Sequence, residues 1–441
     1  MKNMNEVPIN DIKITGGNKL HGEITTNSSK NGATHLLCAS LLNKGTTTLR
    51  GVPRIEEVNR IIEIFESIGV KLEWIGDRDL KIKTPEKFDF ENINRESAGQ
   101  VRSFLMAMGS LPHRMKEFKI PNAGGCKMGN RSITAFRHSL SALGLSITTN
   151  ETDYILDANK LHSADITMYE ASDTATTATL LLASCIKGET TIRFAPPNYQ
   201  VQDVCFFLER CGVKIDGIGN TTMTVHGIDG INLDIEHWVS EDPIESMMFI
   251  SAGAVTKSEL LVKRCPIDFL RLELLKLTLM GLKTEISKEY KSYNERTTLV
   301  DIKVFPSDLV APNDKIHSLP YPGINTDNLP FFVPVATQAE GTTMIHDWMW
   351  ENRAIYFTEL NRLGANITLM DPHRVLIQGP TALRGARIVC PPALRPSMII
   401  LVSMLAAKGE SVLHSVYSIN RGYENIFERL NSIGAEISIL N

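Results

Sequence analysis

One of the seven cysteines is surrounded by glycines and cations, a setting in which a thiol can do chemistry. Cys126 lies within the segment NAGGCKMGNR, residues 122–131. Glycine tolerates positive φ, so this segment can form a loop whose backbone approaches a ligand closely. Nearby cations favour the thiolate, which is the reactive form of cysteine. The segment therefore indicates a reactive thiol, although a glycine-rich turn with an incidental cysteine would have the same composition.

The other cysteines lie in apolar stretches and are predicted to be small core residues. They are Cys38, Cys185, Cys205, Cys211, Cys265 and Cys390. Their scattered positions, the odd total and the lack of a CxxC pair argue against a disulfide framework or a zinc site. The eleven histidines show no HxxxH-type spacing, so we expect neither a metal nor another cofactor.

Length and composition are those of an ordinary globular protein. The chain has 441 residues, 43% of them apolar and 22% charged, and a net charge of −4. Such a length suits roughly two or three domains, and the charge balance gives no reason to expect nucleic-acid binding. The first residues lack the apolar core of a signal peptide, and apolar runs such as Met398 to Ala407 are too short to span a bilayer. We expect a cytoplasmic protein with no membrane contact and no obligate protein partner.

The elements that must position Cys126 follow an internal repeat. An apolar, helix-like run that ends in glycine and leads into a β-rich run recurs at intervals of roughly 70 residues, longer than a solenoid unit. Each glycine is predicted to end a helix in the left-handed conformation, from which the chain turns into a strand. The glycines concerned are Gly69, Gly144, Gly212, Gly281, Gly364 and Gly434.

Each repeat also opens in a similar way. An Ala/Leu-rich helix, such as Ser29 to Leu42 or Ser172 to Cys185, leads through Lys-Gly into a β-branched strand. The helices that follow, such as Glu56 to Ile68 and Asn198 to Cys211, carry apolar residues at helical spacing. A unit is therefore helix, strand, helix, strand. The repetition predicts a mixed α/β protein of two lobes with three units each, divided near residues 239–241.

Several short motifs occur in a fixed order along this repeat. They are Leu20-His21-Gly22-Glu23-Ile24, Ser29-Lys30-Asn31-Gly32-Ala33, the cysteine loop, Asn325-Thr326-Asp327, Glu351-Asn352-Arg353, Leu394-Arg395 and Ile419-Asn420-Arg421-Gly422-Tyr423-Glu424. With the repeat, these motifs resemble the enolpyruvyl transferase family, which includes the EPSP synthases. The resemblance runs from about Ile12 to Ile439. EPSP synthases share the repeat but lack the cysteine loop, so Cys126 favours the sugar-nucleotide branch of the family.

The resemblance implies a fold of two inside-out α/β barrel lobes, with helices inside, sheets outside and six repeats in all. Lobe 1 would comprise residues 29–239 and include the cysteine loop. Lobe 2 would comprise residues 1–28 together with residues 240–441. The substrates would bind between the lobes, which would close around them.

The resemblance also implies a reaction. The enolpyruvyl group of phosphoenolpyruvate would pass to the 3-hydroxyl of UDP-N-acetylglucosamine, and phosphate would be released. This is the first committed step of peptidoglycan synthesis, so a contribution to cell-wall biogenesis, cell shape and cell division would follow. The epoxide fosfomycin, which mimics phosphoenolpyruvate, would alkylate Cys126.

Site residues are implied by the same resemblance. Asp327 would take the proton of the acceptor hydroxyl, while Cys126 would serve C3 of phosphoenolpyruvate as an acid and could hold the substrate as a covalent adduct. Lys30 and Arg421 would complete the catalytic set as cations on the phosphate and carboxylate, since such charge-assisted bonds are strong. The implied substrate-binding residues are Lys30, Asn31, Arg102, Arg131, Ser132, Ile133, Thr134, Ala135, Ser172, Asp173, Asp327, Met349, Arg395 and Arg421.

The sequence departs from the family pattern on the side of the acceptor. Ala393 stands where the family usually carries an aspartate, and residues 132–134 replace a Pro-Val-Asp segment. Glu170 and Asp173 bring carboxylates where a lysine and neutral residues are usual, and Asn198 lies where an acidic residue is usual. Carboxylates near a diphosphate would repel it.

These departures leave alternatives open. One is an enolpyruvyl transferase that acts on a different nucleotide or sugar in secondary metabolism. Another is a non-catalytic paralogue that binds ligand and regulates. The presence of Lys30, Cys126, Arg131, Asp327 and Arg421 argues against the non-catalytic alternative, because drift would have been expected to erase some of them.

Overall fold

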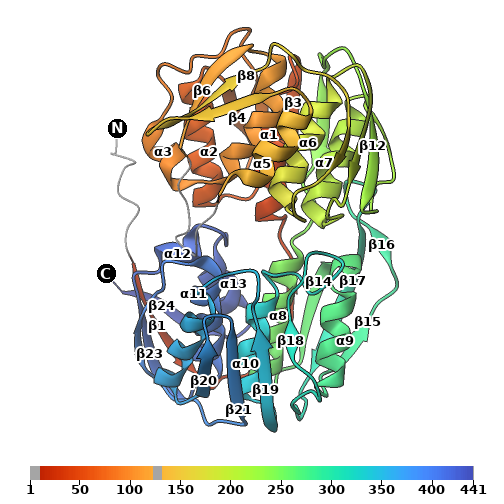
Figure 1. Ribbon diagram of the computed structural model, residues 1–441. Helices are drawn as coiled ribbons and strands as arrows, with labels where there is room; N and C mark the ends of the chain where they lie inside the picture. The colour runs from red at the N-terminus through yellow and green to blue at the C-terminus, as the bar shows by residue number, and fades with distance from the viewer. Residues whose placement is uncertain (1–9, 123–131, 441) are drawn as a thin grey trace.

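The computed structural model describes residues 10–122 and 132–440 and shows two lobes, one above the other in Figure 1. Each lobe has its own apolar core. One core is built from side chains between Ala33 and Val239, and the other from side chains of residues 12–24 and of the chain from Ile244 onward, with Tyr199 added. We propose that the lobes divide after Val239, where the two cores part.

The first lobe contains three sheets within the described residues, with strand orders β13-β3-β5-β4, β6-β8-β7 and β11-β12-β10-β9. Its strands are β3 (Thr46–Arg50), β4 (Lys71–Ile75), β5 (Asp79–Lys83), β6 (Glu117–Pro121), β7 (Ser146–Thr149), β8 (Asp153–Asp157), β9 (Asp165–Thr167), β10 (Gly188–Arg193), β11 (Lys214–Asp216), β12 (Thr222–Gly227) and β13 (Ile235–Trp238). Its helices are α1 (Lys30–Ser40), α2 (Glu56–Ser67), α3 (Arg95–Gln100), η1 (Ser103–Met106), α4 (Ala107–Ser110), η2 (Leu111–His113), α5 (Thr134–Ala142), α6 (Asp173–Ser184) and α7 (Tyr199–Arg210).

The second lobe also contains three sheets among the described residues, ordered β22-β23-β1-β24, β15-β17-β14-β2 and β18-β19-β21-β20, with β16 beside β17. Its strands are β1 (Asp11–Gly16), β2 (Glu23–Thr25), β14 (Leu260–Pro266), β15 (Lys283–Ile286), β16 (Tyr290–Lys291), β17 (Thr298–Phe305), β18 (Ile316–His317), β19 (Gly341–His346), β20 (Asn366–Asp371), β21 (Arg374–Gly379), β22 (Arg387–Val389), β23 (Gly409–His414) and β24 (Glu436–Leu440). Its helices are α8 (Pro243–Val255), η3 (Ile267–Phe269), α9 (Arg271–Leu279), η4 (Leu329–Phe331), α10 (Phe332–Thr337), η5 (Ala354–Leu363), α11 (Leu394–Ala406), α12 (Tyr417–Asn420) and α13 (Ile426–Ser432).

The repeat glycines adopt the predicted conformation. All six have φ between 86° and 97°. Gly364 directly follows its helix, and in each of the other five repeats a single residue separates the end of the helix from the glycine. Glycine is favoured there because it has no Cβ to clash in the left-handed region. The predicted repeat helices are confirmed as α1, α2, α6 and α7, whose bounds differ from the prediction by no more than two residues. The fifth repeat differs, because the helix before its glycine, η5, has the tighter 3-10 geometry.

Each lobe encloses helices that are buried on every side. In lobe 2, α8 is buried along its whole length and α11 along most of it. In lobe 1, α1 and α6 are buried beyond their first turns. A helix that is apolar all round must lie inside the protein, so the sheets and the amphipathic helices take the outside. The first turns of these buried helices are therefore among the few places where polar side chains can meet between the lobes.

Two short segments cross between the lobes side by side. Ser29 N–H donates to the carbonyl of Ser240 at 2.7 Å, and Asp242 N–H donates to the carbonyl of Asn27 at 2.9 Å. The pairing brings the start of α1 next to the start of α8, where Asp242 caps α8 and also accepts the backbone N–H of Lys30 at 3.3 Å. The two paired segments thus place the first turn of α1 beside the space between the lobes.

Among the described residues, no helix combines the length and the apolar character needed to cross a bilayer.

Candidate active site

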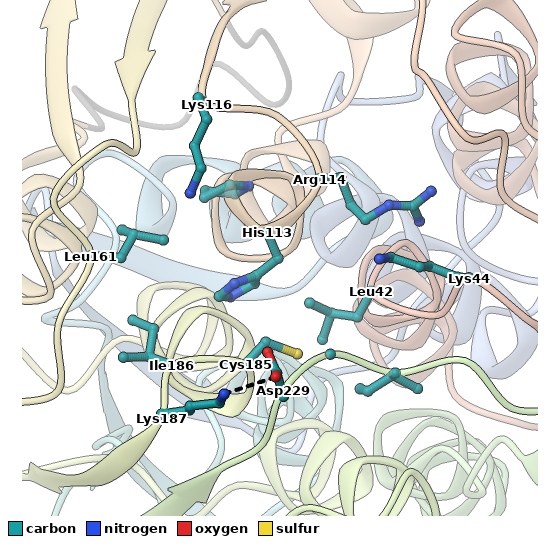
Figure 2. Close-up of a pocket in the computed structure, with 13 residues that line it drawn as sticks. Leu42, Lys44, His113, Arg114, Lys116, Leu161, Cys185, Ile186, Lys187 and Asp229 are labelled. Carbon is teal, nitrogen blue, oxygen red and sulfur yellow. Dashed lines mark ion pairs between the residues drawn. The ribbon is translucent and has the colours of Figure 1, made fainter.

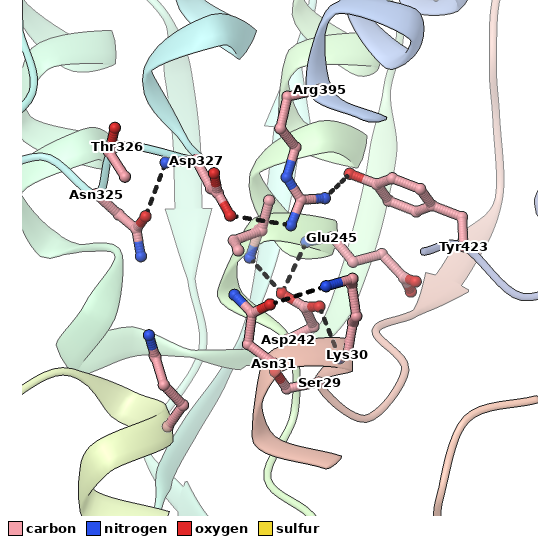
Figure 3. Close-up of polar contacts among 12 residues, drawn as sticks. Ser29, Lys30, Asn31, Asp242, Glu245, Asn325, Thr326, Asp327, Arg395 and Tyr423 are labelled. Atoms are coloured by element: carbon pink, nitrogen blue, oxygen red, sulfur yellow. Dashed lines mark hydrogen bonds and ion pairs between the residues drawn. The ribbon is translucent and has the colours of Figure 1, made fainter. Parts of the chain in front are cut away.

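A cavity of about 620 Å³ lies between the lobes and is lined by both. Lobe 1 contributes the starts of α1 and α6, and lobe 2 contributes the loop before η4, the loop before η5, the start of α11 and Arg421. Figure 3 shows several of these side chains pointing toward one another. Clefts between lobes are common places for substrates, and this one is lined by charged side chains of both signs.

The first turn of α1 presents two polar side chains to the cavity. Ser29 caps the helix by accepting the backbone N–H of Gly32 at 3.0 Å. Lys30 Nζ lies 3.1 Å from a carboxylate oxygen of Glu57 and donates to Asn31 Oδ1 at 3.3 Å. Asn31 Nδ2 in turn donates to the hydroxyl of Tyr199 at 3.0 Å. These contacts hold an amine and an amide side by side at the helix start.

Glu57 joins cations from the two lobes. Its second carboxylate oxygen lies 3.3 Å from Arg421 of lobe 2, while Lys30 contacts the first. Burial alone would raise the pKa of Glu57, but Lys30 and Arg421 together hold that pKa below its usual value. Glu57 is not marked in the sequence, because a charged residue in the first turn of an amphipathic helix is ordinary.

Asp327 lies between two arginines of lobe 2. One carboxylate oxygen is 3.3 Å from Arg395, whose guanidinium also donates to the hydroxyl of Tyr423 at 2.8 Å, and the other oxygen is 3.8 Å from Arg353. Burial would raise the pKa of Asp327, but Arg395 and Arg353 lower it overall. Asp327 is therefore an ionised carboxylate that can accept a proton.

The turn that carries Asp327 is fixed from two sides. Arg353, which is fully buried, donates to the carbonyl of Thr326 at 2.6 Å and pairs with Asp347. Asn325 Oδ1 accepts the backbone N–H of Asp327 at 2.8 Å. The cap position of η4 belongs to Asn328 and not to Asp327. Asp327 is thereby left to face the cavity.

We call Lys30, Arg395 and Arg421, with Asp327 and Glu57, the cation cluster. Its three cations come from the first turn of α1, the first turn of α11 and the residue after α12. All five side chains line the cavity. An anion that entered the cavity here could contact cations of both lobes at once.

We call Glu170 and Asp173, with Arg102 and Gln200, the acid cluster. Asp173 begins α6 and accepts hydrogen bonds on one oxygen from Asn198 at 3.0 Å and from Gln200 at 2.7 Å. Burial raises the pKa of Asp173 to about 7, and the negative charge of Asp327 adds to the rise, while the two amides oppose it. Arg102 donates to the carbonyl of Ser132 at 2.8 Å.

The structure brings most of the predicted site residues to this one cavity. Those that line it are Lys30, Asn31, Arg102, Ser132, Ala135, Ser172, Asp173, Asp327, Met349, Arg395 and Arg421. Ile133 does not line it but packs in the core of lobe 1, and Thr134 begins α5 with its side chain exposed to solvent. Cys126 and Arg131 lie outside the described residues. Ala393 is buried at the start of α11 and supplies no carboxylate beside Arg395.

A second cavity, of about 390 Å³, lies at the ends of α1 and α6 in lobe 1 (Figure 2). His113 approaches the carbonyl of Leu182 at 2.8 Å, and Lys187 pairs with Asp229 at 2.8 Å. Cations suit this place because helices end there and expose carbonyl groups. Cys185, predicted to be a core residue, is only half-buried on its wall, whereas the other described cysteines are buried. None of the predicted site residues lines this cavity.

Within residues 10–122 and 132–440, no group of three or more His, Cys, Asp or Glu side chains is arranged to hold an ion.

The two-lobe fold is similar to that of solved enolpyruvyl transferases. The enolpyruvyl transferase NikO from Streptomyces tendae superposes with a TM-score of 0.84 at 21% identity, over 98% of this chain and 99% of that one. An EPSP synthase from Acinetobacter baumannii superposes with a TM-score of 0.74 at 18% identity, over 98% of this chain and all of that one.

Sequence comparison places the chain in a family. The model of the EPSP synthase (3-phosphoshikimate 1-carboxyvinyltransferase) family matches residues 14–430. A UDP-N-acetylglucosamine 1-carboxyvinyltransferase of Treponema denticola is 32% identical over 97% of this chain and 98% of its own length. One of Bradyrhizobium diazoefficiens is also 32% identical, over 96% of each chain. The chain belongs to the EPSP synthase family of enolpyruvyl transferases, and the resemblance predicted from the motifs is confirmed.

Proposed function

We propose that this chain transfers the enolpyruvyl group of phosphoenolpyruvate to the 3-hydroxyl of UDP-N-acetylglucosamine and releases phosphate, the first committed step of peptidoglycan synthesis. The observation that carries the proposal is the cation cluster, in which Lys30, Arg395 and Arg421 line the cavity between the lobes together with the ionised Asp327. The names of the relatives support the choice of acceptor. Both substrates are cytoplasmic metabolites, so we also propose that the protein acts in the cytoplasm.

The cation cluster suits phosphoenolpyruvate, which carries a phosphate and a carboxylate. Arginine binds both groups in a fork geometry, and hydrogen bonds between charged groups are the strong ones. In the described structure, Glu57 contacts Lys30 and Arg421, and Asp327 contacts Arg395. These carboxylates hold the cations in position and partly offset their positive charge. A more highly charged anion would replace the carboxylates as the partner of these cations.

Asp327 is proposed as the base. Its oxygen would take the proton of the acceptor hydroxyl as that hydroxyl adds to C2 of phosphoenolpyruvate, while a second proton reaches C3. Elimination then breaks the bond between C2 and the bridging oxygen, phosphate leaves with that oxygen, and loss of a proton from C3 restores the double bond. Arg395 lowers the pKa of Asp327 in the absence of substrate, and an anion bound to Arg395 would weaken this effect and make Asp327 a stronger base.

Cys126 is proposed as the acid that serves C3, on the resemblance of its loop alone. Because Cys126 lies outside the described residues, the proposal does not depend on its distance to the cation cluster. Arg131 of the same segment is proposed as a further cation for the substrates on the same ground.

A second candidate function is favoured by the acid cluster. Glu170 and Asp173 line the same cavity as the cation cluster, and two carboxylates are poor neighbours for a diphosphate. This observation favours an enolpyruvyl transferase whose acceptor is a different nucleotide or sugar. The shared reaction would then be unchanged and only the acceptor would differ.

Phosphate release from phosphoenolpyruvate tests both candidates in one assay. The purified protein would be supplied with phosphoenolpyruvate and a panel of UDP-sugars, nucleoside monophosphates and free sugars, and each product would be weighed by mass spectrometry. We expect release with UDP-N-acetylglucosamine and a product that has gained one enolpyruvyl group. Release with another acceptor alone would favour the second candidate, and no release with any acceptor would contradict both. Lys30→Met is the matched inactive control, because it removes one cation of the cluster.

A further inference from the structure

One carboxylate of the cavity lies where a helix start would otherwise favour a phosphate. Asp173 is the first residue of α6, directly after the capping residue Ser172, and its side chain lines the cavity. A helix N-terminus carries partial positive charge and favours anions. Asp173 already supplies an anion at this point, so a phosphate brought to the start of α6 would meet a negative charge of the protein.

The carboxylate of Asp173 is held firmly by two buried amides. Asn198 Nδ2 and Gln200 Nε2 both donate to Asp173 Oδ2, at 3.0 and 2.7 Å. Asn198 is 5% exposed and Gln200 is 4% exposed. A carboxylate held in this way cannot swing out of the path of a ligand without breaking two hydrogen bonds.

The same amide pair leaves one acceptor unused. Gln200 Oε1 is buried, and no described group donates a hydrogen bond to it. Gln200 lines the cavity. An unpaired buried carbonyl costs free energy unless a ligand or water donates to it. The cavity wall at the start of α6 therefore offers the carboxylate of Asp173 to the donors of a ligand, and Gln200 beside it holds a buried carbonyl that receives no hydrogen bond from a described group.

Other charged groups share this part of the cavity. Asp327 faces Asp173 from lobe 2 and raises its pKa further, Glu170 precedes it in the same loop, and Arg102 lies close enough to Glu170 to interact with it. Burial and Asp327 together bring the pKa of Asp173 to about 7. Its negative charge is therefore present above this pH and is lost below it.

We infer that Asp173 is a specificity-determining residue that selects the acceptor by charge. It disfavours an acceptor that brings a phosphate to the start of α6 and favours one that presents hydrogen-bond donors there. The inference rests on the proposed function, because it assumes that the cation cluster takes phosphoenolpyruvate and leaves this wall to the acceptor. A UDP-sugar that brings its diphosphate to the start of α6 would then bind against the charge of Asp173.

The test compares Asp173→Asn with the unchanged protein by calorimetry. Asparagine keeps the shape and can still accept from Asn198 and Gln200, but it carries no charge. We expect the Kd for UDP-N-acetylglucosamine to fall about tenfold above neutral pH, which is the size expected for one like charge near the ligand. The Kd for phosphoenolpyruvate should stay unchanged. Asp229→Asn, which removes one carboxylate at the far end of lobe 1, should change neither value.

The pH dependence separates a charge effect from a structural one. In the unchanged protein, the Kd for UDP-N-acetylglucosamine should fall as the pH is lowered through about 7, the value to which burial raises the pKa of Asp173. In Asp173→Asn it should stay level over the same range. The inference is overturned if the variant binds UDP-N-acetylglucosamine no more tightly than the unchanged protein, or if both proteins keep the same pH dependence.

Failure of the inference is distinguishable from failure of the proposed function. The calorimetric Kd reports on Asp173 whether or not turnover occurs, and UDP at one fixed pH above about 8, where its terminal phosphate is fully ionised, serves as the probe if the UDP-sugar binds too weakly to measure. Phosphate release from phosphoenolpyruvate reports on the proposed function. A protein that releases phosphate with UDP-N-acetylglucosamine, but whose Kd does not respond to Asp173→Asn, would contradict the inference and leave the function standing.

Discussion

The two charged clusters of the cavity differ in how their charges are compensated. In the cation cluster, every carboxylate contacts a cation, and the pKa values of Asp327 and Glu57 are lowered as a result. In the acid cluster, Asp173 contacts neutral amides, and burial raises its pKa. The first cluster is prepared to exchange its carboxylates for an incoming anion. The acid cluster repels an incoming anion, so the two clusters favour different substrates.

Alkylation by fosfomycin should give an all-or-none result among the cysteines. We expect the adduct on Cys126 alone, because the drug mimics phosphoenolpyruvate and a nucleophilic thiolate must open its epoxide. Burial raises the pKa of Cys38 and of Cys211 to about 12, so these thiols stay protonated and unreactive. Mass spectrometry of peptides would locate the adduct, and excess phosphoenolpyruvate should prevent it.

The control for this labelling is Cys185→Ser, which removes the half-buried thiol of lobe 1. Labelling of this variant should match that of the unchanged protein. Adducts spread over several cysteines would remove the case for a special thiol.

Arg395→Met should destabilise the protein as well as abolish turnover. Arg395 is buried and compensates Asp327 and Asp242, so its removal leaves buried carboxylates without their partner. We expect the free energy of unfolding to fall by about 3 kcal/mol, the lower end of the range for a broken buried pair. Urea denaturation would measure it, with the exposed Arg387→Met as the control. A variant as stable as the unchanged protein would show that Arg395 does not stabilise the cluster.

Arg421→Ala should weaken the binding of phosphoenolpyruvate more than the binding of the acceptor. Arg421 reaches the cluster from lobe 2 and contacts Glu57 at 3.3 Å. We expect a loss of roughly 1.5–3 kcal/mol in the binding of phosphoenolpyruvate, the range for a hydrogen bond to a charged group. Calorimetry with each ligand alone would measure it. Equal losses for both ligands would mean that the two clusters do not serve separate substrates.

Glu170→Lys should give the smallest change and act on the acid cluster alone. Glu170 is exposed at the cavity rim, so solvent weakens its effect on a ligand. We expect the KM for UDP-N-acetylglucosamine to fall by up to about tenfold, with the KM for phosphoenolpyruvate unchanged. A KM for the acceptor that does not move would place its diphosphate away from Glu170.

The repeat made much of the fold predictable from the sequence. Glycine has a specific conformational reason to end a helix, and all six repeat glycines have the predicted positive φ. The Ala/Leu-rich runs became buried helices for the same kind of reason, since an all-apolar helix has no face for solvent. The 3-10 geometry of η5 had no comparable signal, because the choice between the two helix types depends on packing.

The site was predictable only where a motif marked it. Lys30, Asp327, Arg395 and Arg421 lie in recognisable motifs, and the structure brings them to one cavity. Glu57 has no such signal, because its role depends on contacts with residues 27 and 364 positions away in the sequence.

The hydrogen-bond partners of Asp173 could not be predicted from the sequence either. Nothing in the local sequence shows that Asn198 and Gln200 donate to its carboxylate across the gap between α6 and α7. Tertiary contacts of this kind follow from the packed structure and not from spacing along the chain.

The most direct test of the account follows the bridging oxygen of phosphoenolpyruvate, which joins C2 to phosphorus. Phosphoenolpyruvate labelled there with heavy oxygen would be turned over with UDP-N-acetylglucosamine, and phosphorus NMR would show where the label goes. Addition at C2 followed by elimination breaks the bond between carbon and oxygen, so the label should appear in the released phosphate. Label that remains on the three-carbon product would mean that the bond between phosphorus and oxygen breaks, and it would contradict enolpyruvyl transfer at the cation cluster.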